Sequence, residues 1–176
     1  VKSGTLSDKV AAMTLLVQES PVHRFETLQG LVGLAKSGSH ASKMAMESLK
    51  ELFGGAELLP DNRRLRIFSV REDGSTVALI LRFFESRLRD LYAEVVSLIE
   101  GYTKHSGKDL RSFAIDAAAH LLASKPEQEA KLLSIVVNKL GDPDGSASTT
   151  AVRALCRVLD KHKAMTSIVC AEVQGF

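Results

Sequence analysis

Apolar residues recur along most of the chain at spacings of three and four positions, the pattern of amphipathic α-helices. A first helix is expected up to about Glu19, with Thr5 or Ser7 as its cap and Ser20-Pro21 as its stop. A second helix follows around residues 25–36, and Ser37-Gly38-Ser39 separates it from a third that closes at Gly54-Gly55. The N-terminal region is therefore predicted to contain three short helices.

The longest apolar pattern predicts a fourth helix from about Thr76 to Tyr102. Its stripe is expected to face the core along its whole length and comprises Leu81, Phe84, Leu88, Leu91, Val95 and Leu98. A fifth helix is expected over residues 108–124. Its alanine-rich face, with Ala114, Ala117 and Ala118, would let a neighbouring helix approach closely.

The C-terminal third carries signals for three more helices. Ser124 and Glu127 have the spacing of a capping box, with Pro126 in the first turn, and Gly141 is placed to cap the end of that sixth helix. A seventh helix, from about Ser146 to Lys161, is expected to turn Val152, Leu155 and Leu159 inward, and an eighth begins near Ala164. Because no segment alternates as a strand does, we expect an all-α fold.

A long connector without regular helix is expected between the third and fourth helices, because Pro60 and Asn62 interrupt any helical pattern there. A polar loop over residues 72–75 should follow it. Seven of the eleven arginines fall between Arg63 and Arg89. The apolar residues of the connector are expected to pack along the helices; they are Leu58, Leu59, Leu65, Ile67 and Phe68.

These arginines form the candidate binding surface of the chain. Guanidinium groups pair with phosphate in a bidentate fork, and they also bridge to carboxylates. Contact with RNA or an acidic partner is therefore weighed against bonds to helix ends and carboxylates of the fold itself, and the two alternatives can coexist. The candidate anchors are Arg63, Arg64, Arg66, Arg82, Arg87 and Arg89, with Lys161 and Lys163 as a second, weaker basic spot.

Composition and motifs give no indication of catalysis, a cofactor, a metal or a small-molecule substrate. Hydrophobic residues make up 45% and charged residues 25% of the chain, and the net charge of +2 is too small to require a nucleic-acid partner. Residues 101–108 depart from the phosphate-binding loop pattern, and no histidine lies at metal-ligand spacing from a cysteine or a second histidine. We expect Cys156 and Cys170 to be buried free thiols, and no apolar run is long enough for a membrane span.

The junction at residues 140–143 resembles a HEAT repeat. It places Asp142 in a turn, and Val152-Arg153 followed by Leu155 gives the Val-Arg-x-x-Leu pattern on the next helix. With the spacing of the fifth and seventh helices, this predicts a HEAT/armadillo-like α-solenoid of antiparallel helical hairpins, with one broad face free for partners. Residues 1–176 would form one helical-repeat segment of a larger protein, divided into first helices (1–56), the basic connector and loop (57–76), and the long helix with HEAT-like hairpins (77–176).

Five stretches resemble the CCAAT-binding factor family and run in family order: residues 3–16, 50–53, 58–68, 79–85 and 136–143, of which 58–68 is the most specific. The resemblance implies an N-terminal helical-repeat region of a non-enzymatic protein of the nucleus and nucleolus. The family acts in assembly of the large ribosomal subunit, pairs with nucleolar complex protein 2 and travels on early pre-ribosomal particles. Its members carry a longer polar insertion where this chain has only residues 70–77.

The resulting expectation is a non-enzymatic scaffold that binds pre-rRNA and other assembly factors on nucleolar pre-ribosomes. A CCAAT-promoter-associated transcription regulator is one alternative, although no helix-turn-helix, zinc finger or basic zipper signature is present to read base edges. A HEAT-type protein–protein adaptor, whose basic connector holds an acidic partner helix, is the other.

Overall fold

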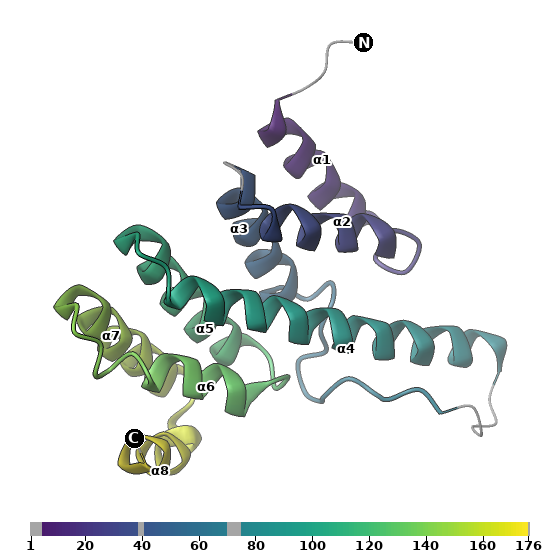
Figure 1. Ribbon diagram of the computed structural model, residues 1–176. Coiled ribbons are helices and arrows are strands. Elements are labelled where there is room, and N and C mark those ends of the chain that lie inside the picture. The colour runs from purple at the N-terminus through teal and green to yellow at the C-terminus, as the bar shows by residue number, and fades with distance from the viewer. Residues whose placement is uncertain (1–4, 39–40, 70–74, 176) are drawn as a thin grey trace. The chain divides into compact units, whose positions relative to one another are not determined.

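The computed structural model describes residues 5–38, 41–69 and 75–175. These residues form eight α-helices, one 3-10 helix and no strand, which confirms the all-α class (Figure 1). The chain divides into two compact units, Val1–Val95 and Val96–Phe176, and the long helix α4 (Thr76–Thr103) contributes residues to both. The expected cap around Ser39 and most of the polar loop at 72–75 lie outside the described residues.

The first unit is built on three mutually contacting helices, α1 (Leu6–Glu19), α2 (Phe25–Lys36) and α3 (Ala41–Gly54). Aromatic contacts join helix α4 to them. The ring of Phe53 on α3 lies 4.9 Å from that of Tyr92, and the ring of Phe25 on α2 meets that of Phe84 edge-on at 5.9 Å. Phe53 and Tyr92 are both fully buried, so this pair lies in the core of the unit.

Thr5, rather than Ser7, caps helix α1. Its hydroxyl accepts a hydrogen bond from the backbone N–H of Asp8 at 3.3 Å, and the Asp8 carboxylate accepts from the backbone N–H of Thr5 at 2.8 Å. This reciprocal pair is a capping box, in which two otherwise unpaired donors of the first turn are satisfied. The bonds from Thr5 hold the pKa of Asp8 below its usual range.

The second unit centres on helix α5 (Lys108–Ser124), whose bounds agree with the prediction. Helix α5 contacts α6 (Glu129–Val137) and α7 (Gly145–Lys161), and α6 also contacts α8 (Thr166–Gly175), which follows the 3-10 helix η1 (Lys163–Met165). The expected alanine face is buried: Ala114 and Ala118 are 0% exposed. Small side chains on that face allow the neighbouring helices to lie close to α5.

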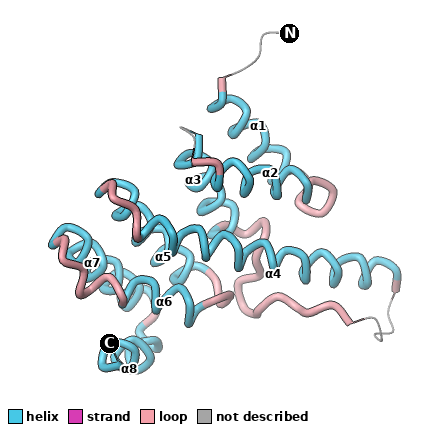
Figure 2. The backbone as a smooth tube through the Cα atoms, in the orientation of Figure 1, coloured by secondary structure: helices cyan, strands magenta, loops and turns pink. Residues whose placement is uncertain are grey.

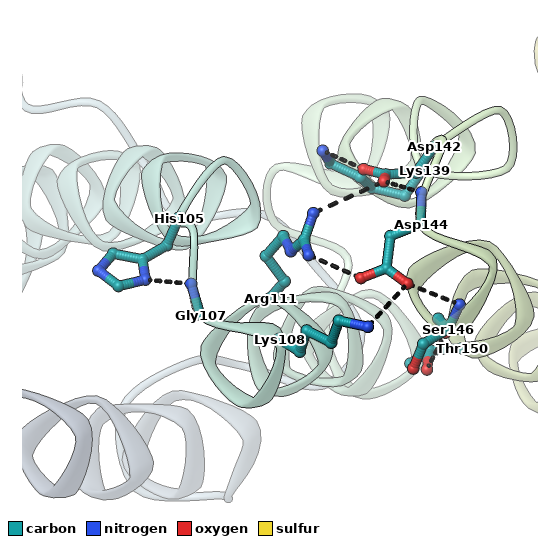
Figure 3. A network of polar contacts seen from close by, with 9 residues as sticks. All are labelled: His105, Gly107, Lys108, Arg111, Lys139, Asp142, Asp144, Ser146 and Thr150. Carbon is teal, nitrogen blue, oxygen red and sulfur yellow. Dashed lines mark hydrogen bonds and ion pairs between the residues drawn. The ribbon is translucent and has the colours of Figure 1, made fainter.

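A network of charges holds the turn between α6 and α7 (Figure 3). Arg111 of α5 donates to Asp144 at 2.7 Å, and Lys139 lies 3.0 Å from Asp142. Asp144 also caps α7 by accepting from the N–H of Ser146 at 3.1 Å. The backbone N–H of Asp144 and the ammonium of Lys139 lower the pKa of Asp142, because both donate hydrogen bonds to its ionised carboxylate.

Both predictions about the ends of helix α6 are wrong. The helix begins at Glu129 after Gln128, a left-handed residue (φ 58°) that makes no side-chain cap. Ser124 does not cap it, because its hydroxyl donates instead to the carbonyl of His120 in the preceding helix, at 2.7 Å. At the other end the helix stops at Val137 and continues as tight turns, so Gly141 is not its cap.

Two predictions about burial in the second unit are also wrong. Val152 is 49% exposed, because α7 turns another set of small residues inward: Ala147, Ala151, Ala154 and Val158. Cys156 and Cys170 are free thiols as expected, but both are exposed. For Val152 and Cys156 the buried face of α7 differs from the predicted one, whereas α8, which carries Cys170, buries only Val169.

The apolar stripe of helix α4 is buried along only part of its length. Leu88 and Val95 are 0% exposed, whereas Leu81, seven residues before Leu88 on the same face, is 46% exposed. In the connector, Leu58, Leu59 and Leu65 pack inward as predicted, but Ile67 is 64% exposed. The first turns of α4 therefore do not contribute to the core as the sequence pattern predicted.

We predict that Leu88→Ala lowers the free energy of unfolding by about 2–5 kcal/mol, because it removes buried methyl groups and leaves a cavity. Leu81→Ala is the matched control and should cost less than about 1 kcal/mol, since that side chain is already half in water. Chemical denaturation followed by circular dichroism measures both. Equal losses for the two variants would contradict the burial pattern of α4.

Candidate partner-binding surface

The basic connector runs beside the first half of helix α4 without helix or strand structure (Figure 2). One carboxylate, that of Glu85 on α4, fixes it. The guanidinium of Arg63 donates to both oxygens of Glu85, at 2.8 and 2.7 Å, and the backbone N–H of Arg66 donates to the same carboxylate at 2.9 Å. A bidentate arginine–carboxylate pair is among the strongest side-chain hydrogen bonds in proteins, and here it defines the path of the connector.

This arrangement also sets the ionisation of both partners. The hydrogen bonds from Arg63 lower the pKa of Glu85, with a further contribution from the N–H of Arg66, and they raise the pKa of Arg63. The side chain of Glu85 is 18% exposed and that of Arg63 is 43% exposed. The pair therefore lies at the edge of the surface, partly shielded from water.

The candidate arginines of the connector divide into two roles. Arg63 has a structural role, because both terminal nitrogens of its guanidinium donate hydrogen bonds to Glu85 within the fold. Arg64 and Arg66 are exposed, and the contact of Arg66 with Glu85 is made by its backbone, so its side chain extends from the connector. The structure therefore shows an internal contact for Arg63, and contact of Arg64 and Arg66 with RNA or an acidic partner stays a prediction.

Arg87 lies among aromatic rings. Its guanidinium carbon is 5.2 Å from the ring centre of Phe25 and 5.9 Å from that of Phe83, and Phe83 also meets Phe68 of the connector edge-on at 5.7 Å. Cation–π contacts of this kind hold a guanidinium in place while leaving its charge available. Arg87 is exposed, so its guanidinium lies at the surface.

The other candidate cations are not gathered at this place. Arg82 and Arg89 are half-buried and lie seven residues apart on a different face of α4. Lys161 and Lys163 are exposed in the second unit, at the end of α7 and in η1. Arg157, which was not among the predicted candidates, pairs with Asp116 of α5 beside a groove that Lys161 also lines.

Glu85 was not among the residues predicted from the sequence. It is the one acidic residue among the described residues of 63–69 and 75–89, which contain six arginines. That isolation is the signal that marks it as a counter-charge for the connector. Its distance of 22 residues from Arg63 hides the pairing from any local pattern.

We predict that Arg63→Gln raises the pKa of Glu85 toward its ordinary value of 4.5, because the largest cause of the depression is removed. A depressed carboxyl pKa contributes stability above the pKa of the unfolded chain, and this contribution is lost as pH falls through the folded-state value. NMR titration of the carboxyl carbon measures it. Arg64→Gln is the control; an unchanged Glu85 pKa in the Arg63 variant would refute the pairing.

Comparison with known proteins identifies relatives along nearly the whole chain, although no protein-family model matches it. It is 40% identical over 188 residues to CCAAT/enhancer-binding protein zeta of Homo sapiens, an alignment that covers 99% of the chain and 18% of that protein. It is 34% identical over 197 residues to ribosome biogenesis protein NOC1 of Chaetomium thermophilum, an alignment that covers 99% of the chain and 19% of that protein. Nucleolar complex protein 1 of Drosophila melanogaster is 31% identical to it over 185 residues, and this alignment covers 97% of the chain and 16% of that protein.

The chain thus spans less than a fifth of the length of these three relatives. The aligned region includes the connector and helix α4, because it covers nearly all of this sequence. The resemblance to the CCAAT-binding factor family that the five stretches indicated is confirmed, because the chain is homologous over nearly its whole length to one segment of these proteins.

Proposed function

We propose that this chain is part of a non-enzymatic scaffold for assembly of the large ribosomal subunit in the nucleolus. The observation that carries the proposal is the homology to two proteins whose names assign them to ribosome biogenesis and to a nucleolar complex. The contribution of this segment would be a rigid helical surface that holds immature RNA and other assembly factors, including nucleolar complex protein 2.

A solenoid built from antiparallel hairpins is the architecture that we propose for that surface. Helix α5 contacts both α6 and α7, and α1, α2 and α3 contact one another, as consecutive helices do in helical repeats. Repeats of this kind stack into elongated arrays with extended binding faces. Many weak contacts along such a face suit a partner as large as a pre-ribosomal particle.

The exposed arginines of the connector are the proposed RNA contacts. Arg64 and Arg66 extend from a segment that Glu85 holds in place, so their positions are fixed at little entropic cost to binding. Contacts with phosphate position an RNA without reading its sequence, which suits a scaffold. Lys161 and Lys163 would supply a second contact in the other unit.

The absence of catalytic activity is also part of the proposal. The pKa values of Asp8, Glu85, Glu100 and Asp142 lie below their ordinary values, chiefly because these carboxylates accept hydrogen bonds. A general acid needs a carboxyl whose pKa is raised. These carboxylates behave as structural anchors instead.

A promoter-bound regulator is the second candidate function, and the name of the human relative favours it. Reading a promoter sequence requires side chains that reach base edges in the major groove, from an element such as a recognition helix. The arginines of the connector belong to an irregular segment lying against α4, which suits phosphate contact better.

We predict that Arg64→Ala combined with Arg66→Ala weakens binding of a single-stranded RNA oligonucleotide and lowers its salt slope by about 1.4, because two phosphate contacts are lost at roughly 0.7 each. Fluorescence anisotropy over a range of salt concentrations measures the slope. Arg63 stays unchanged in this variant, so that the connector keeps its anchor on Glu85.

Lys9→Ala combined with Lys43→Ala is the control, because it removes the same charge from helices α1 and α3 of the same unit. It should leave the slope near that of the unaltered protein. Equal salt slopes of RNA binding for the two double variants would show that the connector does not bind RNA. In a separate experiment, binding of a partner protein that survives nuclease treatment would favour the protein adaptor.

A further inference from the structure

Four large apolar side chains are exposed on the first two turns of helix α4. Val77 is 66% exposed, Ile80 51%, Leu81 46% and Phe83 50%. Single exposed apolar residues are ordinary on protein surfaces, but a contiguous group of them marks an interaction site. We call these four residues the α4 apolar patch.

The patch continues the buried face of the same helix. Leu81 precedes Leu88 by seven residues and Val77 precedes it by eleven, so the three side chains lie within a narrow angular range along one line of α4. Leu88 is 0% exposed. The apolar stripe of α4 is therefore exposed to solvent at its N-terminal end and buried further along the helix. Ile80 and Phe83 lie beside the exposed part and enlarge the apolar surface.

Positive charge lies at one edge of this patch. Residues 75–89 contain Arg82, Arg87 and Arg89; Arg82 and Arg89 lie on another face of the helix, and the one acidic residue of this range, Glu85, is engaged by Arg63. Arg87 lies one turn after Phe83 and two turns after Ile80, on their side of the helix. Its guanidinium is held over the Phe83 ring, which places a charge at the C-terminal end of the patch.

This combination selects one kind of occupant. Aliphatic side chains such as Val77, Ile80 and Leu81 gain nothing from phosphates, and nucleic-acid bases stack on aromatic rings rather than on aliphatic groups. A second copy of this chain would bring a second Arg87 to the contact, and the two like charges would repel. An amphipathic helix satisfies both features when carboxylates flank its apolar face.

We propose that the α4 apolar patch is the docking site for an acidic amphipathic helix of another protein. Its apolar residues, at positions i, i+3, i+4 and i+7, cover Val77, Ile80, Leu81 and Phe83. A glutamate or aspartate at the edge of that helix pairs with the guanidinium of Arg87. This site goes beyond the scaffold function proposed above and is separate from the RNA contacts at Arg64 and Arg66.

The test uses a synthetic helical peptide with leucines at positions i, i+3, i+4 and i+7 and glutamates on both flanks. A matched peptide carries lysines in place of the glutamates. We expect the unaltered chain to bind the glutamate peptide and to bind the lysine peptide at least roughly tenfold more weakly, because the cation of Arg87 borders the patch. Fluorescence anisotropy gives both affinities.

Ile80→Ser combined with Leu81→Ser should weaken binding of the glutamate peptide by roughly tenfold or more, since it removes the apolar centre of the contact. Arg87→Gln should weaken binding severalfold and reduce its salt dependence. Val152→Ser is the control, because Val152 is similarly exposed (49%) but lies on α7 of the second unit. A melting temperature within a few degrees of the unaltered chain verifies that each variant folds.

Equal affinity of the glutamate peptide for the unaltered chain and the Ile80/Leu81 variant would overturn the proposal, as would a preference for the lysine peptide. Self-association in analytical ultracentrifugation that disappears in this variant would overturn it in favour of a second copy. RNA-oligonucleotide binding should persist in the variant with its salt slope intact. Loss of RNA binding there would assign the patch to RNA, whereas loss only in the Arg64/Arg66 variant leaves both proposals standing.

Discussion

The position of the irregular connector in the first unit depends on the carboxylate of Glu85. This group binds the guanidinium of Arg63 through both oxygens and also accepts the backbone N–H of Arg66. The connector forms no helix or strand that would fix its path, so these bonds and the burial of Leu58, Leu59 and Leu65 determine where it lies. The neighbouring side chains of Arg64 and Arg66 are exposed on the connector that these bonds hold.

Two chemically different surfaces follow from that arrangement on the first unit. The connector exposes Arg64 and Arg66, which suit phosphate groups. The start of helix α4 exposes aliphatic and aromatic side chains with Arg87 at their edge, which suits a protein helix with carboxylates. A scaffold that joins RNA to protein partners needs both kinds of surface, and neighbouring placement would allow RNA and protein to be held together.

Helix positions and the irregular connector were predictable from the sequence, because glycine, proline and the three-to-four-residue spacing of apolar residues act on local structure. The bounds of α5 are the clearest case. Burial was less predictable. Which turns of α4 are covered depends on where other helices end, so Leu81 shares the pattern of Leu88 but not its burial. Ser124 fits a capping pattern, but its hydroxyl bonds within its own helix instead. The partnership of Glu85 with Arg63 spans 22 residues, beyond any local signal.

The central claim is that Glu85 holds an arginine-bearing connector against α4 so that the connector contacts RNA. Ultraviolet crosslinking of the intact, longer protein in cells, with the crosslinked peptides identified by mass spectrometry, tests it most directly. The account predicts crosslinks to ribosomal precursor RNA within residues 63–69, and their loss when Glu85 is replaced by alanine. Crosslinks confined to other parts of the protein, or unaffected by Glu85→Ala, would contradict it.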